Sequence, residues 1–321
     1  MNILQFIFHY HQRRLADMLE IASKQEDIGF WFAVDGIRQP IIMLEGWTRI
    51  CQHIYQDEIF KKWNEIYKEL QEKIGELQHY WEAERQMFQM NSIPDAVKKE
   101  LNELVVLRKA TLEIVLIAGG WLYDNQVGLM NKQLSHFDWG NDEETIDKME
   151  IFYINQVELL GEQEEFNFSD VKGDLRELRH KLRWLCIYPH ATLGLFSYSP
   201  FSETRNLTRM KKYMADKVEQ SPYAILPTLL KEEHQILVDK YALLSVNWIV
   251  EKLGKFYRTG LKEIILREAI KESGMFSPDT DKQNSYKLLG HSQPRMDILL
   301  SVSSTVTSLY FQEKNIESLL V

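Results

Sequence analysis

Apolar side chains recur at every third or fourth position through residues 57–86. Because consecutive residues of an α-helix are rotated by about 100°, this spacing predicts one apolar stripe along a long amphipathic helix. Similar periodicity covers 98–118, 146–160, 171–186 and 237–270, and we find no alternating strand pair with a turn between. The sequence therefore predicts an all-α fold. The residues of the first stripe are Ile59, Trp63, Ile66, Leu70, Ile74, Leu77 and Trp81.

Five segments rich in turn-forming residues interrupt the helical pattern, and they predict about eight to ten helices. These segments are 91–96, 137–144, 196–204, 219–227 and 273–285. A chain of 321 residues suits one large domain or two ordinary ones. We predict two helical-bundle halves, residues 1–160 and 161–321, that together form one unit, with 196–235 as the main asymmetry.

Charge is unevenly distributed between these halves. Residues 1–160 contain 16 Lys and Arg against 26 Asp and Glu, a net charge of −10, whereas the remainder has 22 against 21, a net charge of +1. A net charge of −9 for the whole chain argues against nucleic acid as a general partner, because phosphate backbones are bound by clustered cations. It leaves room for one local basic site.

The remaining composition indicates a cytoplasmic protein with no membrane partner. The longest apolar run, 114–123, is much shorter than the roughly 20 residues that a membrane span requires. The first residues lack a basic leader and a cleavage site, so we expect no signal peptide. Cys51 and Cys186 fall within apolar helical patterns, which predicts two reduced, packed thiols.

Residues 172–184, "KGDLRELRHKLRW", concentrate cations on one side of a predicted helix. On a helical wheel Lys172, Arg176, Arg179 and Arg183 share a strip about 60° wide, while Asp174 and Glu177 lie far from it. We call these four cations the arginine ridge. Like charges in a row destabilise a helix by a few tenths of a kcal/mol per pair, so a compensating interaction is expected.

Two compensations are consistent with the arginine ridge. It could pair with carboxylates of the acidic first half, on the helix that carries Glu65, Glu69, Glu72 and Glu76. Alternatively it borders a cleft and binds a multivalent anion, for which the permanently charged, forked guanidinium is well suited. The first alternative gives a helical protein-interaction or scaffold module, and the second gives an anion-binding protein.

The sequence also contains a faint internal repeat. "DGIRQPIIML" (35–44) precedes "LQEKIGELQHYW" (70–81), and "GDLRELRHKLRW" (173–184) precedes "VNWIVEKLGKFYRTG" (246–260). Each half thus pairs an arginine-bearing helix with a later long helix that contains a glycine, Gly75 or Gly254. Since glycine costs about 1 kcal/mol relative to alanine inside a helix, we expect both glycines at close helix crossings. The repeat predicts a pseudo-twofold relation between the halves.

This half-repeat resembles the CHAD domain, the conserved histidine α-helical domain. The second-half motif positions are Gly173, Arg176, His180 and Arg183, followed by the aromatic Trp184. The first-half positions are Asp35, Arg38, Ile42 and Glu45, with Pro40 expected to break the first motif helix. The resemblance implies a central cavity lined by basic residues, and binding of inorganic polyphosphate or similar anions without catalysis.

The sequence gives less support for a metal site or a catalytic site. Glu76 with His79, and Glu177 with His180, have the E-x-x-H spacing of di-iron bundles, but the helical wheel turns Glu76, His79 and Glu177 away from the apolar stripes. Phosphate-binding loops, nucleophile elbows and Cys-x-x-Cys pairs are not found in the sequence. We therefore predict no metal, no cofactor and no enzymatic activity.

The favoured hypothesis is non-catalytic binding of a phosphate-rich anion, such as polyphosphate, with the second half supplying most of the site. A protein partner or a second copy of the chain is the alternative. The predicted anion-binding residues are Lys172, Arg176, Arg179, His180, Arg183 and Arg38.

Overall fold

A computed structural model describes residues 2–34, 38–123, 125–163, 165–202, 207–214, 218, 220–230, 235–277, 280–290 and 294–321. Helices dominate the described chain, which confirms the all-α prediction. Those before residue 165 are α1 (Ile3–Ala22), α2 (Ile28–Val34), α3 (Arg38–Tyr55), α4 (Glu58–Phe88), α5 (Asp95–Ala118), α6 (Gln126–Leu134) and α7 (Asp142–Gly161). Those after it are η1 (Val171–Leu175), α8 (Arg176–Ala191), α10 (Leu207–Met210), η2 (Lys211–Tyr213), α12 (Lys240–Ser273), α13 (Asp281–Leu289), α14 (Met296–Gln312) and η4 (Glu317–Leu319).

The long helices coincide with the periodic segments. The stripe at 57–86 becomes α4, which begins where the Asp57 side chain accepts a hydrogen bond from the backbone N–H of Ile59. The last periodic segment becomes α12, whose first turn is capped in the same way by Asp239. Its end is set by Gly274, which has the left-handed φ of 61° that glycine adopts without strain.

The structure differs from the helical prediction in two details. Pro40 does not break its helix, because α3 begins at Arg38 and places Pro40 in the first turn, where a missing N–H leaves no helical hydrogen bond unmade. A strand pair is also present. Strands β1 (Phe196–Tyr198) and β2 (Ile236–Val238) pair in parallel, with Phe196 opposite Ile236. Strands of three residues are too short to give a detectable alternation in the sequence.

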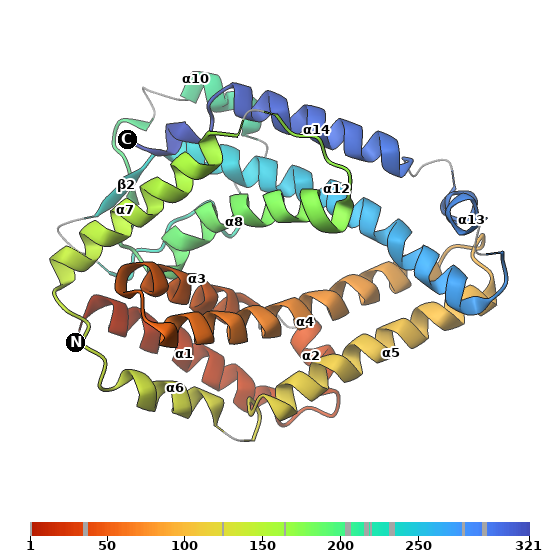
Figure 1. Cartoon of the computed structure of the whole chain (residues 1–321), viewed down its shortest axis with the longest axis horizontal. Helices are drawn as coiled ribbons and strands as arrows, with labels where there is room; N and C mark the ends of the chain where they lie inside the picture. Colours follow the sequence, from red (N-terminus) through yellow and green to blue (C-terminus); the bar gives the residue numbers. More distant parts are fainter. Residues whose placement is uncertain are drawn as a thin grey trace.

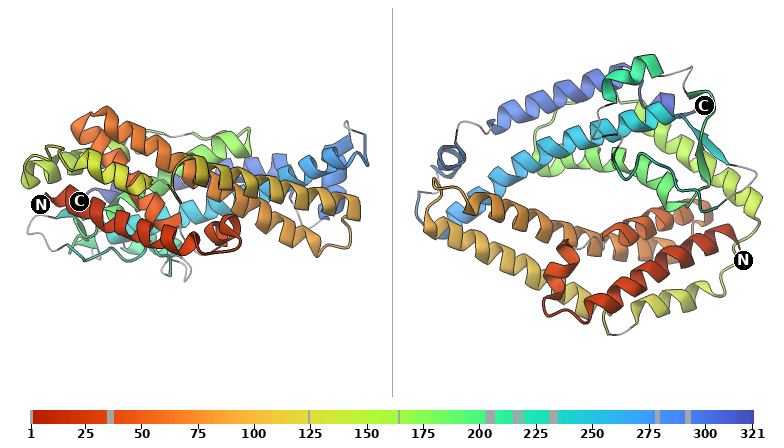
Figure 2. Two further views of the ribbon diagram at one scale, coloured as in Figure 1. Left: turned by 90° about the horizontal axis from the view of Figure 1, so that it is seen from below. Right: turned by 180° about the vertical axis from the view of Figure 1, so that it is seen from behind.

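The helices form two groups that converge at both ends of the molecule (Figure 1). One group contains α1 to α5, and the other contains α8, α12 and α14. The view from behind in Figure 2 shows α5 meeting α12 at one end, while α3 contacts α8 towards the other. One hydrophobic cluster includes side chains of both groups.

An aromatic cluster around Trp47 anchors the first group of helices. The fully buried Trp47 ring stacks on Phe8 of α1, with ring centroids 4.8 Å apart, and meets the edge of Phe60 of α4. Its indole N–H donates a hydrogen bond to the carbonyl oxygen of Leu4 at 3.0 Å. Trp47 therefore ties α1, α3 and α4 together.

The close approach between the two groups occurs at Gly46 on α3. A Cβ atom there would lie 3.2 Å from Ile187 and 3.3 Å from Trp184, both on α8.

Both cysteines are buried free thiols, as predicted. No helix in the described ranges is both long enough and apolar enough to span a membrane.

Replacing Trp47 by alanine should destabilise the fold by about 3–5 kcal/mol, because it removes a fully buried indole and leaves a cavity between three helices. Chemical denaturation of wild type and Trp47→Ala measures this change. Leu159→Ala on α7 is the control, since Leu159 is 61% exposed and its truncation should change the unfolding free energy by less than about 0.5 kcal/mol. Equal effects of the two substitutions would contradict the packing described.

Candidate functional site

The arginine ridge is carried by η1 and α8. The predicted α-helix begins instead with a wider π-turn, Val171–Leu175, whose first turn is capped by the Asp170 carboxylate on the N–H of Gly173. Leu178 and Leu182 of α8 are buried in the core. The cationic side chains extend from the opposite side of the helix, towards α4 and α12.

These cations line a cleft between α4, α8 and α12. One cavity of about 280 Å³ is lined by all six predicted site residues, together with Glu72, Glu76, His79 and Tyr257. A second, of about 340 Å³, shares Arg38, His79, Arg179 and Arg183 with the first and adds Tyr223, Glu251 and Arg258. We call these adjoining cavities the cleft. The fold therefore brings Lys172, Arg176, Arg179, His180, Arg183 and Arg38 together.

Arg38, Arg179 and Arg183, here called the inner arginines, lie where the two cavities meet. Among the described residues, no carboxylate lies within 4.0 Å of any of their guanidiniums. Arg38 donates to the amide oxygen of Gln78 at 3.2 Å, and Arg183 makes a long contact of 3.5 Å to the hydroxyl of Tyr223. The Nε atoms of Arg38 and Arg179 are buried without a hydrogen-bond partner in the described chain.

Only the outer end of the arginine ridge forms the predicted pairing with the first half. Arg176 lies 3.2 Å from Glu72 of α4, and its side chain is 49% exposed. Glu76 instead pairs with Lys73 on its own helix, at 3.1 Å. Glu65 and Glu69 are exposed, and neither lines the cleft. The inner part of the ridge is not neutralised by α4.

Burial and nearby positive charges lower the pKa values of two of the inner arginines, Arg38 and Arg179. Burial lowers the pKa of Arg38 to about 10, with further contributions from the charges of Arg183 and Arg179. Burial likewise lowers the pKa of Arg179 to about 10, assisted by Arg183 and Arg258. Both guanidiniums remain protonated at neutral pH. They form a concentrated positive charge without a counterion among the described residues.

Gly75 and Gly254 provide space for two of these guanidiniums. A Cβ atom on Gly75 would lie 2.7 Å from a terminal nitrogen of Arg38, and one on Gly254 would lie 3.0 Å from Nε of Arg179. The nearest neighbour of each glycine is thus an arginine side chain. The predicted close helix crossings at these glycines are wrong, because the buried backbone at each glycine lies against a guanidinium.

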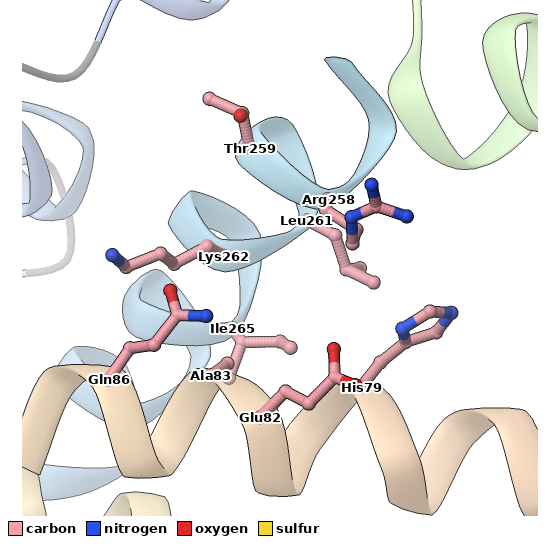
Figure 3. A pocket seen from close by; sticks show the side chains of 9 residues that line it. All are labelled: His79, Glu82, Ala83, Gln86, Arg258, Thr259, Leu261, Lys262 and Ile265. Carbon is pink, nitrogen blue, oxygen red and sulfur yellow. The ribbon is translucent and has the colours of Figure 1, made fainter. Parts of the chain in front are cut away.

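His79 is a cleft residue that the sequence analysis misplaced. The helical wheel turned Glu76 and His79 outward, yet both line the cleft, because α4 contacts α3 and α5 on its apolar side and faces α8 and α12 across the cavity. His79 and Glu82 of α4 and Arg258 of α12 point into a further space of about 180 Å³ (Figure 3). In both long helices a glycine is followed four positions later by a residue that lines the cleft: His79 follows Gly75, and Arg258 follows Gly254. This spacing is the sequence signal that could have revealed the face of each helix that borders the cleft.

The two cleft histidines are held neutral by their surroundings. Burial lowers the pKa of His79 to about 3, with further effects from Arg38, Arg179, Arg258 and Arg176. Burial and neighbouring arginines, Arg49 foremost, also lower the pKa of His180 to about 3. A bound anion would offset the arginine contribution.

The first-half motif contributes little besides Arg38. Ile42 is buried, and Glu45 is buried in a pair with Arg49 at 3.0 Å. The Arg49 guanidinium stacks over Trp184 at 4.3 Å, so this pair belongs to the α3–α8 contact. Asp35 lies outside the described residues. Arg38, however, lies among the inner arginines rather than at the edge of the site.

The described residues contain no group of three His, Cys, Asp or Glu arranged to hold a metal ion. A scan against family models, a search of the curated proteins and a search of the solved structures each found no match. The site is therefore interpreted from its own chemistry.

Acidification should destabilise the protein partly through His79. Its pKa is about 3 in the fold against an ordinary 6.5, so between these values the unfolded chain binds more protons and stability falls as the pH falls. Melting temperatures at pH 7, 6 and 5 should decrease more steeply for wild type than for His79→Gln. Glu76, Glu82 and the other histidines remain in both proteins, so the difference between the slopes isolates His79. Parallel slopes would contradict this assignment.

Proposed function

We propose that this chain binds a phosphate-rich anion in the cleft, without converting it chemically. The observation that carries the proposal is the meeting of Arg38, Arg179 and Arg183 with no carboxylate within 4.0 Å among the described residues. Buried like charges are unfavourable unless a counterion or hydrogen bonds compensate them. An anion with several oxygens would supply both.

Phosphate groups suit this arrangement because of guanidinium geometry. Each guanidinium offers parallel N–H donors that fit two oxygens of one phosphoryl group. Three guanidiniums around one space favour a ligand with several phosphoryl groups over a single carboxylate. Protonated guanidiniums supply charge and hydrogen bonds but accept no proton at neutral pH, which supports binding rather than catalysis.

The CHAD resemblance gains support from the two helix pairs, and we propose that the chain is a divergent member with a pseudo-twofold repeat. In the first pair Arg38 of α3 lies against Gly75 of α4, and in the second Arg179 of α8 lies against Gly254 of α12. We therefore align Arg38 with Arg179, three residues later than the motif spacing suggested. In this register each half contributes one guanidinium that rests on a glycine.

The competing hypothesis, a scaffold module with an internally paired ridge, is favoured by one described contact, between Arg176 and Glu72. It requires carboxylate partners for the inner arginines as well. Substitutions in the cleft separate the two functions, because a structural ion pair stabilises the fold and a ligand-binding cation stabilises the complex.

Replacing Arg38, Arg179 or Arg183 by glutamine should weaken binding of inorganic tripolyphosphate at least tenfold each, since a charge-assisted hydrogen bond is worth about 1.5–3 kcal/mol. Melting temperatures of the free variants should stay equal or rise, because each substitution relieves repulsion. Titration calorimetry across a salt series, with melting curves, measures both effects. Arg176→Gln should weaken binding less, since this arginine already pairs with Glu72.

Lys181→Gln is the matched control for these variants. Lys181 lies on the same helix but pairs with Glu177 at 2.7 Å and does not line the cleft. Its loss should change tripolyphosphate affinity by less than about threefold. A lower melting temperature of the arginine variants without any loss of binding would reject the proposed function and support the scaffold hypothesis.

Gly75→Ala and Gly254→Ala should also weaken binding without lowering stability. Alanine inside a helix is more stable than glycine by up to about 1 kcal/mol, and the guanidinium is a flexible end that can move aside. The melting temperature should therefore be unchanged or higher, while tripolyphosphate binding weakens because Arg38 or Arg179 is displaced. Binding equal to wild type in both variants would show that the glycines do not position these arginines.

A further inference from the structure

Cations around the cleft fall into two classes according to their partners. Four of them, here called the outer cations, each have a carboxylate within 4.0 Å: Arg176 with Glu72, Lys73 with Glu76, Arg108 with Glu268, and Arg258 with Glu251. Lys172 is an exposed exception at the same edge, with no carboxylate that close among the described residues. The inner arginines have none either. Positive charge without a carboxylate partner is therefore concentrated at the inner arginines.

Carboxylates also line the parts of the cleft on either side of the inner arginines. Glu72 and Glu76 line the cavity that all four residues of the arginine ridge also line. Glu82 and Glu251 lie in the cavity on the other side of the inner arginines, together with the neutral side chains of Tyr223 and Asn247. Glu82 also projects into the third space, beside Gln86 (Figure 3). A ligand that extends from the inner arginines towards Tyr223 and Asn247 therefore meets Glu82 and Glu251.

Arg108, one of the outer cations, is poorly placed to compensate for these carboxylates. Arg108 is held by the hydroxyl of Tyr80 at 3.1 Å and by Glu268 at 3.2 Å, and Tyr80 donates to the same carboxylate at 2.6 Å. Moving Arg108 towards a ligand would break a network that joins α4, α5 and α12. The Glu251 pair with Arg258 is longer, at 3.9 Å, and exposed, so it is the weaker restraint.

From this distribution we infer that the cleft selects a compact, multiply charged oxyanion, of the size of a triphosphate group, and discriminates against long polyphosphate chains. This inference rests on the proposed function and specifies its ligand class. A triphosphate group places its charge among the inner arginines. The flanking phosphates of a longer chain would face Glu82 and Glu251 at close range, where like charges repel.

Binding of tripolyphosphate, medium-chain and long-chain polyphosphate to the full chain tests this selectivity. A long chain offers many overlapping places to bind, so its affinity must be expressed per three-phosphate unit. On that scale we expect long chains to bind at least tenfold more weakly than tripolyphosphate. Equal or tighter binding per unit by long chains would overturn the inference.

The double variant Glu82→Gln/Glu251→Gln provides a second test. It removes the carboxylates on one side of the inner arginines and frees Arg258, so the affinity of long chains per unit should rise at least fivefold more than the affinity of tripolyphosphate. Glu103→Gln/Glu143→Gln is the control for net charge, because both residues are exposed and neither lines the cleft. Equal gains by the two double variants would overturn the inference.

These results also distinguish failure of the inference from failure of the proposed function. If tripolyphosphate binds and Arg179→Gln weakens that binding at least tenfold, the proposed function stands whatever the effect of chain length. If neither tripolyphosphate nor long chains bind, or if Arg179→Gln leaves both affinities unchanged, the proposed function fails and the inference fails with it.

Discussion

Repulsion among three guanidiniums is the interaction on which the rest of this structure depends. Arg38, Arg179 and Arg183 come from α3 and α8 and meet in a cleft closed by α4 and α12. Such a centre raises the free energy of the folded state, and the surrounding apolar core must offset it. A buried cluster that includes side chains from both groups of helices provides the opposing contribution.

Rigidity of the helices keeps the repelling groups together. Helices α3 and α8 are in close contact at Gly46, and α5 and α12 are joined by Arg108, Tyr80 and Glu268. With both ends of the cleft fixed, the side chains have little room to separate. Gly75 and Gly254 then give the guanidiniums of Arg38 and Arg179 positions against helix backbone. The charge is thus organised before any ligand arrives, which lowers the cost of ordering on binding.

Under the proposed function, the arrangement of acidic residues adds selectivity to this charge. A chain with a net charge of −9 would repel polyanions at long range, so attraction must come from a local field. The acidic edges restrict that field to the space between the inner arginines. Under the proposed function, recognition depends on ligand size as well as on ligand charge.

Helical periodicity predicted most of the fold, because a stripe such as the one in α4 reflects local geometry that each segment carries by itself. It also placed the cations of the arginine ridge on one face of the segment that forms η1 and α8. Local pattern misplaced His79, since a helix such as α4 packs its apolar stripe on α3 and α5 and presents a second, polar face to the cleft. It also missed β1 and β2, whose pairing joins segments far apart in the chain.

The sequence by itself determined the helices, the excess of cations on one of them and the presence of Gly75 and Gly254. Tertiary structure alone decided that Arg176 forms an ion pair with Glu72. It also decided that Arg179 and Arg183 lie beside Arg38. Pairing between residues more than a hundred positions apart depends on how α3, α4, α8 and α12 are assembled, and no single segment encodes that assembly. Whether a cation is neutralised or left to bind a ligand is therefore a property of the packed helices.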